Sequence, residues 1–523
     1  MKRAPFSPEL QKHRDCLARL LPKLEAVPGW YGSIYLERKS SETLRVDLKQ
    51  TLISDQSTLG VVFRIYDGYT LFEQATDELD EAELNRTVTE FANRVASTPA
   101  PAGATQRLYE PQTWGQRLTS RHETELTSQL PALLTAQTQV HFGIGFTQDP
   151  ASVTTEQRIA ALKKWIENCQ RLAPEQGFAP GEVTFLLGSQ TSAVEESVFL
   201  DRESNMSQTL YRQALTQVIM SGGDRTFHRT GGLGGMELVE LTDTQTVELL
   251  GDLKQLKSAK RLHPGKYRVL LGPVLTGVLA HEAFGHSQEG DTCARGRSKA
   301  WDLYKSGESV GNQHATILNN PALFANGATG SAGWGSYFFD EEGWLAQEQV
   351  LLDQGKLQPP MTNFTSALRL GVPRTANGKR ESWANGVYTR QTNTYFSAGT
   401  RTYDQLLSQI EDGFLATTPA GGMEDPKGMG IQVGIGYLKE VKGGKLTGRV
   451  FKGPAGGEIQ MTGYVPDVLN QIVDKSKIQY ESAEPDTVNH PFNDAGGCGK
   501  YHKELVYAGC GGPFVLLDQV MLG

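Results

Sequence analysis

Two histidines and a glutamate fall within six residues of this chain, at His281, Glu282 and His286. Two imidazoles can hold a zinc ion, and a carboxylate beside them can take a proton from a water molecule that the metal activates. The segment therefore makes the chain a candidate metalloprotease. A catalytic zinc normally has three protein ligands and one open position for water, so one ligand has to come from elsewhere in the chain.

The spacing of the two histidines is unusual for a helix. The common zinc helix places its histidines four residues apart, an offset of about 40°, so that both rings face the same side. Here the step is five residues, which at about 100° per residue separates the rings by about 140°. A π-type turn would widen the helical period, and a helix that ends at Gly285 would send His286 off on a reoriented backbone. The sequence therefore predicts an irregular helix at Gly285.

The local sequence leaves the third ligand open. The carboxylates of Glu289 and Asp291 lie just downstream, and other histidines and cysteines are further candidates. Cys498 and Cys510 each lie between glycines, where missing side chains let a loop approach a metal closely. A thiolate with two imidazoles is a known type of catalytic zinc site. The five cysteines of the chain are too dispersed for a disulfide framework.

The motif resembles the signature of a known family. Residues 281–286, extended through Glu289-Gly290-Asp291, are similar to the signature of the TldD/PmbA family of zinc metalloproteases, whose catalytic members carry this five-residue step. Residues 389–395 resemble the Arg-Met-Thr-Asn-Thr loop of that family, with Gln391 in place of the usual Met. We expect this departure to bear on substrate preference more than on the chemistry.

Two later stretches agree in order with the same family. Residues 452–454, followed by a helix expected at 466–473, resemble the segment before the last ligand, and residues 497–500 resemble the Thr-Cys-Gly-Lys that carries it. The resemblance assigns Cys498, not Cys510, as the third ligand. It spans most of the chain, weakly before residue 240 and strongly around 270–295.

The resemblance implies a role for each group. One zinc ion per catalytic subunit would be held by His281, His286 and Cys498, with Glu282 as the proton acceptor and later donor. Ligating histidines usually donate their second N–H to a carboxylate or carbonyl, so Glu289 and Asp291 are candidates to orient the imidazoles. The loop with Arg390 and Asn393 is expected at the active-site cleft. A substrate backbone that adds to a sheet edge would explain tolerance of many sequences.

The resemblance also implies partners. The subunit is expected to pair with a second one around an enclosed chamber, where short or unfolded peptides are cut. The second subunit would be another copy, or a related subunit that lacks the histidine motif. Since this chain keeps the motif, it resembles the catalytic kind.

Composition limits the other partners. The net charge is −8, and the 51 basic residues are scattered rather than gathered in blocks, which argues against a surface for nucleic acid or anionic membrane. The first residues carry no apolar signal-peptide run, and no stretch approaches the ~18 to 20 apolar residues of a membrane span. We expect a cytoplasmic protein that binds neither nucleic acid nor membrane.

The 523 residues are too many for one compact core, so we expect two domains in an α+β fold. The first, residues 1–238, would combine helices with an antiparallel sheet. The second, residues 239–523, would be a β-rich metalloprotease domain that carries the motif helix and the late cysteine. Apolar periodicity predicts helices at 7–27, 79–96, 117–136, 154–173 and 243–260. It predicts strands within 30–72 and at 182–187, 196–200 and 267–271, and a turn or hinge at the glycine cluster 231–235.

Two other functions compete with a zinc peptidase. The chain could be a non-catalytic binding or assembly subunit whose metal is structural or absent. A structural metal would not require a carboxylate beside its ligand, so Glu282 favours the enzyme. The other alternative is metal-dependent hydrolysis of a small amide, which the sequence leaves open.

Overall fold

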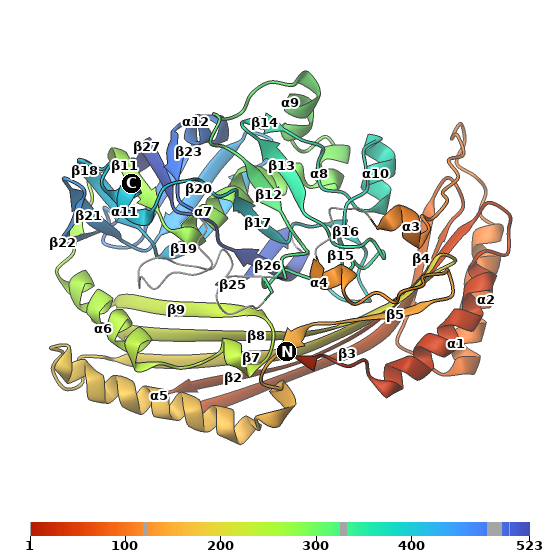
Figure 1. Ribbon diagram of the computed structural model, residues 1–523, viewed down its shortest axis with the longest axis horizontal. Helices are drawn as coiled ribbons and strands as arrows, with labels where there is room; N and C mark the ends of the chain where they lie inside the picture. Colours follow the sequence, from red (N-terminus) through yellow and green to blue (C-terminus); the bar gives the residue numbers. More distant parts are fainter. Residues whose placement is uncertain (1, 119–123, 325–331, 478–493, 501–502) are drawn as a thin grey trace.

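The computed structural model describes residues 2–118, 124–324, 332–477, 494–500 and 503–523. It has two layers (Figure 1): a long curved sheet formed by the N-terminal half, and a more compact body formed by the C-terminal half on the concave side of that sheet. Helices cover the opposite face of the curved sheet. The predicted α+β class is confirmed.

The N-terminal sheet has seven strands, in the order β4-β3-β2-β7-β8-β5, with β9 on β8. Its four long strands form antiparallel pairs, and the short β5 alone runs parallel to its neighbour β8. The strands are β2 Tyr31–Asp47, β3 Thr51–Tyr66, β4 Leu71–Thr76, β5 Gln139–Gly143, β7 Phe185–Asp201, β8 Ser204–Ser221 and β9 Asp224–Leu233.

Three amphipathic helices cover the outer face of this sheet: α1 Pro8–Leu24, α2 Glu81–Ala96 and α5 Thr155–Glu175. At the start of each helix a side-chain oxygen, that of Ser7, Asp80 and Thr154 respectively, accepts a hydrogen bond from a backbone N–H of the first turn. Their apolar stripes pack on the sheet, as in the buried cluster that joins α1 and α2 to β2 and β3. The helices predicted at 7–27, 79–96 and 154–173 are confirmed.

The helix predicted at 117–136 is wrong. Two single turns, α3 Trp114–Arg117 and α4 Thr124–Thr127, stand near its start, and residues 119–123 lie outside the described part of the chain. Contacts with distant residues, rather than helical hydrogen bonds, fix the start of this segment: the Arg117 guanidinium is buried and donates to Asp201 at 2.9 Å.

Two strand predictions also change. Residues 185–187 and 196–200 belong to one strand, β7, because the polar residues between them also pair across the sheet with β2 and β8. Residues 182–184 precede this strand. The first glycines of the 231–235 cluster continue β9 in register with β8. The turn begins only at Gly234, whose φ of 158° disfavours other residues.

Two sheets form the C-terminal layer. The larger has the order β10-β22-β21-β18-β11-β27-β23-β20-β19, with β24 on β27, and the smaller has the order β14-β13-β12-β17-β26-β25. The strands of the larger sheet are β10 Lys260–Arg261, β11 Gly265–Leu271, β18 Asp412–Ala416, β19 Pro419–Asp425, β20 Gly430–Ile435, β21 Leu438–Lys442, β22 Lys445–Lys452, β23 Ile459–Tyr464, β24 Ile472–Lys475 and β27 Val515–Leu522. Those of the smaller sheet are β12 Ile317–Asn319, β13 Gln349–Asp353, β14 Lys356–Leu357, β17 Asn393–Phe396, β25 Asp494–Lys500 and β26 Lys503–Cys510. The helix predicted at 466–473 is α12, Val465–Asn470.

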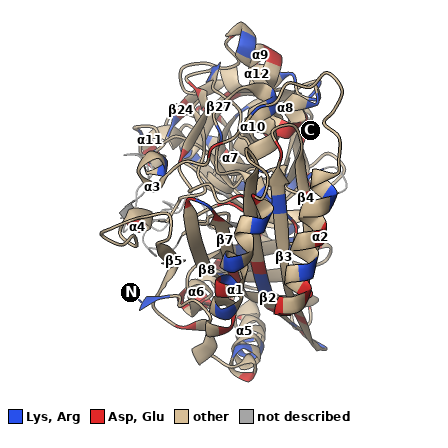
Figure 2. Cartoon of the chain, turned by 90° about the vertical axis from the view of Figure 1, so that its right-hand side faces the viewer, with Lys and Arg blue, Asp and Glu red and all other residues tan. Residues whose placement is uncertain are grey.

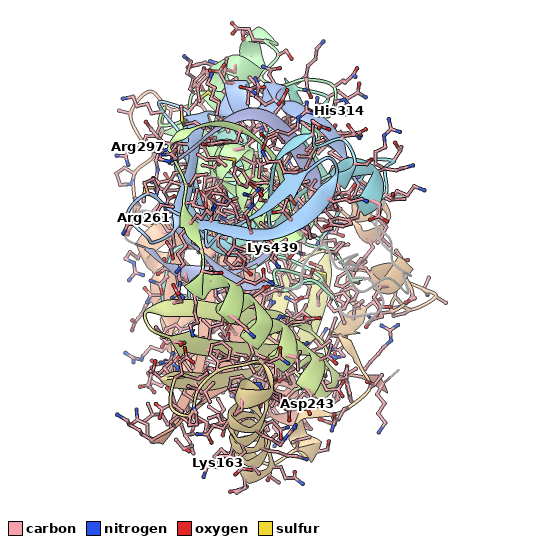
Figure 3. The ribbon with its side chains drawn as sticks, turned by 90° about the vertical axis from the view of Figure 1, so that its left-hand side faces the viewer. Lys163, Asp243, Arg261, Arg297, His314 and Lys439 are labelled. Carbon is pink, nitrogen blue, oxygen red and sulfur yellow. The ribbon has the colours of Figure 1, made fainter. Side chains whose placement is uncertain are left out.

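Helix α6, Asp243–Lys257, joins the two layers. It begins as predicted, with the Thr242 hydroxyl accepting from Gln245 N. Three of its leucines, Leu249, Leu250 and Leu253, pack in the same buried cluster as α5 and the N-terminal sheet, although the helix follows the expected boundary at 238/239. Asp252 of α6 pairs with Lys439 of β21 at 3.0 Å, and Figure 3 shows Lys439 near the level where the layers meet.

The surface of the N-terminal layer mixes both signs of charge. Figure 2 shows basic and acidic residues interspersed along α1 and α2, and the two helices are joined by the Arg19–Glu81 pair at 2.8 Å. Among the helices of the described ranges, none combines the length and apolar character needed to cross a bilayer.

Candidate metal centre

The motif helix follows directly from a central strand. Strand β11 lies between β18 and β27 in the large sheet, and helix α7, Pro273–Ala280, starts two residues after it with Pro273 in the first turn. Proline is favoured there because its missing N–H would be unpaired in any case. Nearly all of α7 is buried, so the sheet and the core fix where its C-terminal end lies.

The helix is irregular where the sequence predicts it. His281–Gly285 form a π-helical turn, closed by the His286 N–H on the His281 carbonyl, and a 3₁₀ turn follows from His286 to Gln288. This five-residue hydrogen bond widens the period and brings the two rings together. Their centroids lie 4.8 Å apart with the planes at 84°. The predicted irregularity at Gly285 is confirmed.

Gly285 is needed for close packing rather than for a special backbone angle, since its φ is −65°. A Cβ at this position would lie 2.7 Å from Cδ of Gln391 and overlap its amide. The Gln391 amide lies 3.4 Å from the His281 carbonyl, and its Oε1 accepts from Thr394 at 2.8 Å. Gln391 is fully buried, so this residue supports the π turn from behind.

Three donor atoms converge after the π turn. A nitrogen of His281, a nitrogen of His286 and the sulfur of Cys498 all lie within 4.8 Å of one another, and all three side chains are buried. Cys498 Sγ is 3.4 Å from His286 Nε2. His281 Nδ1 is buried and has no hydrogen-bond partner among the described residues. Two imidazoles, one of which has an orphaned nitrogen, and a thiol fit a zinc ion, which takes nitrogen and sulfur ligands.

The charges of the cluster also suit a metal. Burial alone would raise the pKa of the Cys498 thiol, but the neighbouring imidazoles hold that pKa well below its usual value. Burial opposes charge on His286 as well, yet Cys498 and Glu289 raise its pKa well above normal. The metal-free pair is therefore a thiolate beside an imidazolium. The thiolate is the form that binds metal, and the imidazolium has to release its proton first.

Glu289 contacts one of the two imidazoles. Its Oε2 lies 3.3 Å from His286 Nδ1 and 2.9 Å from Lys500 Nζ, and its Oε1 lies 3.6 Å from Arg390 Nε. Against the effect of burial, Lys500 and His286 hold the pKa of this carboxyl well below its usual range. A fixed carboxylate on Nδ1 directs Nε2 of the same ring toward Cys498.

Asp291 does not take the role expected for it. Asp291 lies in helix α8 (Gly290–Ala294). Its Oδ1 pairs with Lys500 Nζ at 2.5 Å, whereas the contact of an acidic side chain with His286 Nδ1 comes from Glu289. Lys500 also donates to the Thr389 carbonyl at 3.2 Å. The sequence reading missed Lys500 as a functional residue, although it stands two positions after Cys498 in β25.

The loop expected at the cleft lies inside the protein. Arg390 is buried and donates to the Cys498 carbonyl. Asn393 is fully buried and donates to the Asn320 carbonyl at 2.8 Å and to Ser336 Oγ at 2.9 Å. Asn393 begins β17, which pairs with β12 and β26 on its two sides, so this stretch supports the metal cluster from within the small sheet.

A second glutamate lies beside Glu282. Carboxylate oxygens of Glu282 and Glu424 and a nitrogen of His286 lie within 4.8 Å of one another. Burial and the nearby Glu282 raise the pKa of Glu424 to about 8. Strand β19, which carries Glu424, is so close that a Cβ at Gly422 would lie 2.8 Å from Glu282 Oε1. The sequence reading missed Glu424, because only the order of strands brings it here.

Cys510 is the other candidate for the third ligand. The backbone of Cys510 ends β26, where it pairs with Asp494 and Thr394, but its side chain is not among the described parts of the chain. The choice of Cys498 over Cys510 therefore rests on the resemblance and on the convergence of Cys498 with the two histidines.

Known proteins with sequences similar to this chain carry metalloprotease names. Residues 264–523 match a sequence profile described as the PmbA/TldA metallopeptidase C-terminal domain. A metalloprotease of Methanothermobacter thermautotrophicus is 29% identical over 62% of this chain and 67% of its own length. A metalloprotease TldD homolog of Haemophilus influenzae is 28% identical over 65% of this chain and 68% of its own. A zinc metalloprotease TldD homolog of Saccharolobus solfataricus is 29% identical over 31% and 35%.

Solved structures share the fold. A putative modulator of DNA gyrase from Bacteroides thetaiotaomicron has a TM-score of 0.67 at 16% identity, over 99% of both chains. TldE from Thermococcus kodakarensis has a TM-score of 0.65 at 15% identity, over 98% of this chain and 100% of its own. At such low identity these neighbours establish the architecture and leave the chemistry to the residues of this chain.

Proposed function

This chain belongs to the PmbA/TldD family, whose C-terminal domain spans its residues 264–523, and we propose that it is a zinc-dependent peptidase. The observation that carries the proposal is the convergence of His281, His286 and Cys498 around a π turn that also presents Glu282. Relatives named metalloprotease and zinc metalloprotease support it.

Each residue of the site has its own proposed role. Zinc, when bound by His281, His286 and Cys498, supplies a Lewis acid that acidifies water and polarises a carbonyl. Glu282 follows His281 directly in the π turn, so its carboxylate accepts a proton beside the ligand cluster and returns it to the leaving amine. Glu289 holds His286 in orientation, and Lys500 holds Glu289.

The edge of the large sheet offers a place for substrate. Strand β19 is the last in the strand order, its residues Gly421 to Met423 are exposed, and Gly422 packs on Glu282. A peptide in extended form that pairs with this edge would pass directly by the Glu282 carboxylate. Such pairing uses main-chain groups and accepts many sequences. Short or unfolded peptides, which can adopt an extended strand, are the proposed substrates.

The non-catalytic alternative has less support. A structural metal needs closed coordination and no proton acceptor, whereas Glu282 lies beside the ligands and is flanked by Glu424. We retain as part of the proposal a cytoplasmic location and pairing with a second copy or with a related subunit that lacks the histidine motif. Sedimentation of the purified chain, alone and with such a subunit, distinguishes these assemblies.

One experiment tests the activity. Wild-type protein and the Glu282→Gln variant are compared for zinc content and for cleavage of an unstructured peptide mixture. We expect equal zinc and loss of cleavage by the variant, because the substitution keeps the shape of the side chain and removes its basicity. Unchanged cleavage by Glu282→Gln would contradict the mechanism, and a wild-type protein that binds zinc and cuts no peptide would favour the binding subunit.

A further inference from the structure

A polar cavity of about 340 Å³ lies between the two layers, behind the hairpin that carries Cys498. Its walls are the concave face of the N-terminal sheet, contributed by β2, β3, β7 and β8, the segments 337–341 and 379–382, and residues 505–507 of β26. This size is within the ordinary range for small-molecule sites. None of the three ligand residues lines it.

The hairpin β25–β26 separates this cavity from the metal cluster. Gly497 pairs with Tyr507, and the next residue, Cys498, pairs with Val506. Successive side chains of a strand point to opposite faces, so Tyr507 faces the cavity while Cys498 faces the histidines. Arg212 of β8 lies over the Tyr507 ring, 4.6 Å from its centroid. The cavity is therefore a second site, with its own set of charged groups.

Two ion pairs lie on the wall of the cavity. Lys39 pairs with Glu37 at 2.8 Å, and Arg212 Nε pairs with Glu195 Oε2 at 3.1 Å. These two pairs cancel, so they give the cavity no net charge. A ligand with a large net charge of either sign would find no counter-charge in them.

Two groups on the wall keep unused hydrogen-bonding capacity of opposite kinds. Lys379 Nζ donates to the Tyr507 carbonyl at 3.0 Å, which uses one of the three N–H bonds of an ammonium. Glu195 Oε1 is buried and has no hydrogen-bond partner among the described residues. A buried polar atom without a partner costs free energy. One wall thus has donors to offer and another has an acceptor to satisfy.

The protonation of the wall agrees with a ligand of low net charge. Burial, with Arg212 nearby, lowers the pKa of Lys379 to about 7. Burial raises the pKa of the Glu341 carboxyl to about 8. Near neutral pH these two groups therefore carry only part of a charge, and Lys379 can take up a proton when a carboxylate arrives.

We propose that this cavity binds a small zwitterion, such as a free dipeptide, with its carboxylate on Lys379 and its ammonium group on Glu195. The mouth of the cavity is lined by small hydroxyl side chains, Ser40, Ser41, Ser57 and Thr58, of which Ser57 and Thr58 are exposed. The proposal goes beyond the peptidase activity, because it uses none of the groups that hold zinc.

Calorimetry with four related probes tests the ligand class. Zinc-loaded Glu282→Gln protein, which is expected not to cut peptides, is titrated with glycylglycine, N-acetylglycylglycine, glycylglycinamide and N-acetylglycylglycinamide. We expect glycylglycine to bind, and each blocked form to bind about 10-fold or more weakly, since each loses a charged hydrogen-bonding partner. Equal binding of all four probes, or no binding of glycylglycine, overturns the proposal.

Variants test the position. Lys379→Met and Glu195→Gln should each weaken glycylglycine about 10-fold or more. Ser57→Trp, at the exposed mouth, should block entry without changing a buried group. Lys163→Met is the matched control and should bind normally. Lys163 is exposed on α5, which covers the other face of the N-terminal sheet, and it is labelled in Figure 3.

A last variant separates the cavity from the metal centre. The His281→Ala variant should still bind glycylglycine. If this variant loses binding, the ligand binds at the metal centre and the proposal is overturned. Cleavage assays on wild-type protein judge the peptidase separately. Failure of one proposal therefore leaves the other standing.

Discussion

Cys498 Sγ lies 3.4 Å from His286 Nε2 although the two residues are 212 positions apart in the sequence. The contact depends on two separate structures: the π turn that aims His286, and the hairpin β25–β26 that carries Cys498. Arg390 ties these structures together, because it donates to the Cys498 carbonyl and pairs with Glu289. The metal cluster is thus assembled from the large sheet on one side and the small sheet on the other.

Replacing Cys498 should remove the metal. For Cys498→Ser we expect zinc affinity to fall by more than the about 10- to 100-fold typical of outer-shell changes, since a ligand itself is lost. Cobalt-substituted wild-type protein should show a sulfur-to-cobalt charge-transfer band that the variant lacks. Cys169→Ser, a buried cysteine of α5, is the matched control and should keep the band. A band that persists in Cys498→Ser would transfer the ligand role to another thiol, Cys510 being the first to test.

Gly285 should tolerate no side chain while Gln391 is present. Gly285→Ala places a Cβ against the Gln391 amide, and overpacking of this kind costs about 1–3 kcal/mol in the free energy of unfolding. We also expect zinc content to fall, because the π turn has to shift. Gly251→Ala in α6 is the control: nothing lies within 4 Å of its added Cβ, and removing a helical glycine should be neutral or stabilising by about 0.5–1 kcal/mol.

A double mutant assigns the cause. Gly285→Ala combined with Gln391→Ala should be less destabilised than the sum of the single variants, with a coupling on the order of 1 kcal/mol. Denaturant unfolding of all four proteins gives this number. Strict additivity would show that Gln391 is not what excludes a side chain at Gly285.

The pH dependence of stability should report Glu424. Its folded pKa, about 8, lies above the ordinary value for a glutamate, so between about pH 4.5 and 8 the folded state binds more protons than the unfolded state. Stability conferred by the protonated form is therefore full below about pH 4.5 and is lost as pH rises toward 8, by at most about 1.4 kcal/mol per pH unit. Thermal unfolding of metal-free protein should show this slope.

The variant Glu424→Gln removes the titrating group. Compared with wild type it should gain stability as pH rises through this window and show a flatter curve. Glu83→Gln, on the exposed face of α2, is the control and should leave the slope unchanged. Identical slopes in Glu424→Gln and wild type would assign the proton uptake to another group.

These residues also show how far the sequence alone reaches. The irregular helix could be predicted, because the angle between two side chains five positions apart follows from local geometry. Cys498 could not be chosen over Cys510 from the residues, and needed the resemblance. Glu424 and Lys500 were missed, since β19 and β25 reach the motif only through the order of strands in two sheets. The helix expected at 117–136 failed for a related reason: Arg117 is held by Asp201, a distant partner.

The contact between Gly422 and Glu282 leads to a last prediction, about turnover. A Cβ at position 422 would lie 2.7 Å from Glu282 Cγ, 2.8 Å from its Oε1 and 2.7 Å from Val278 Cγ1. Gly422→Ala therefore presses on the Glu282 side chain, and we expect the three ligand residues to stay in place. We expect kcat to fall about 10-fold or more, with the roughly 10²- to 10⁴-fold contribution of a general base as the upper limit, and zinc content to stay unchanged. Gly430→Ala in the neighbouring strand β20, where the added Cβ meets nothing within 4 Å, should keep full activity. Normal turnover by Gly422→Ala would mean that the position of Glu282 beside β19 is not the one from which it acts. Loss of zinc would mean that β19 also supports the ligands.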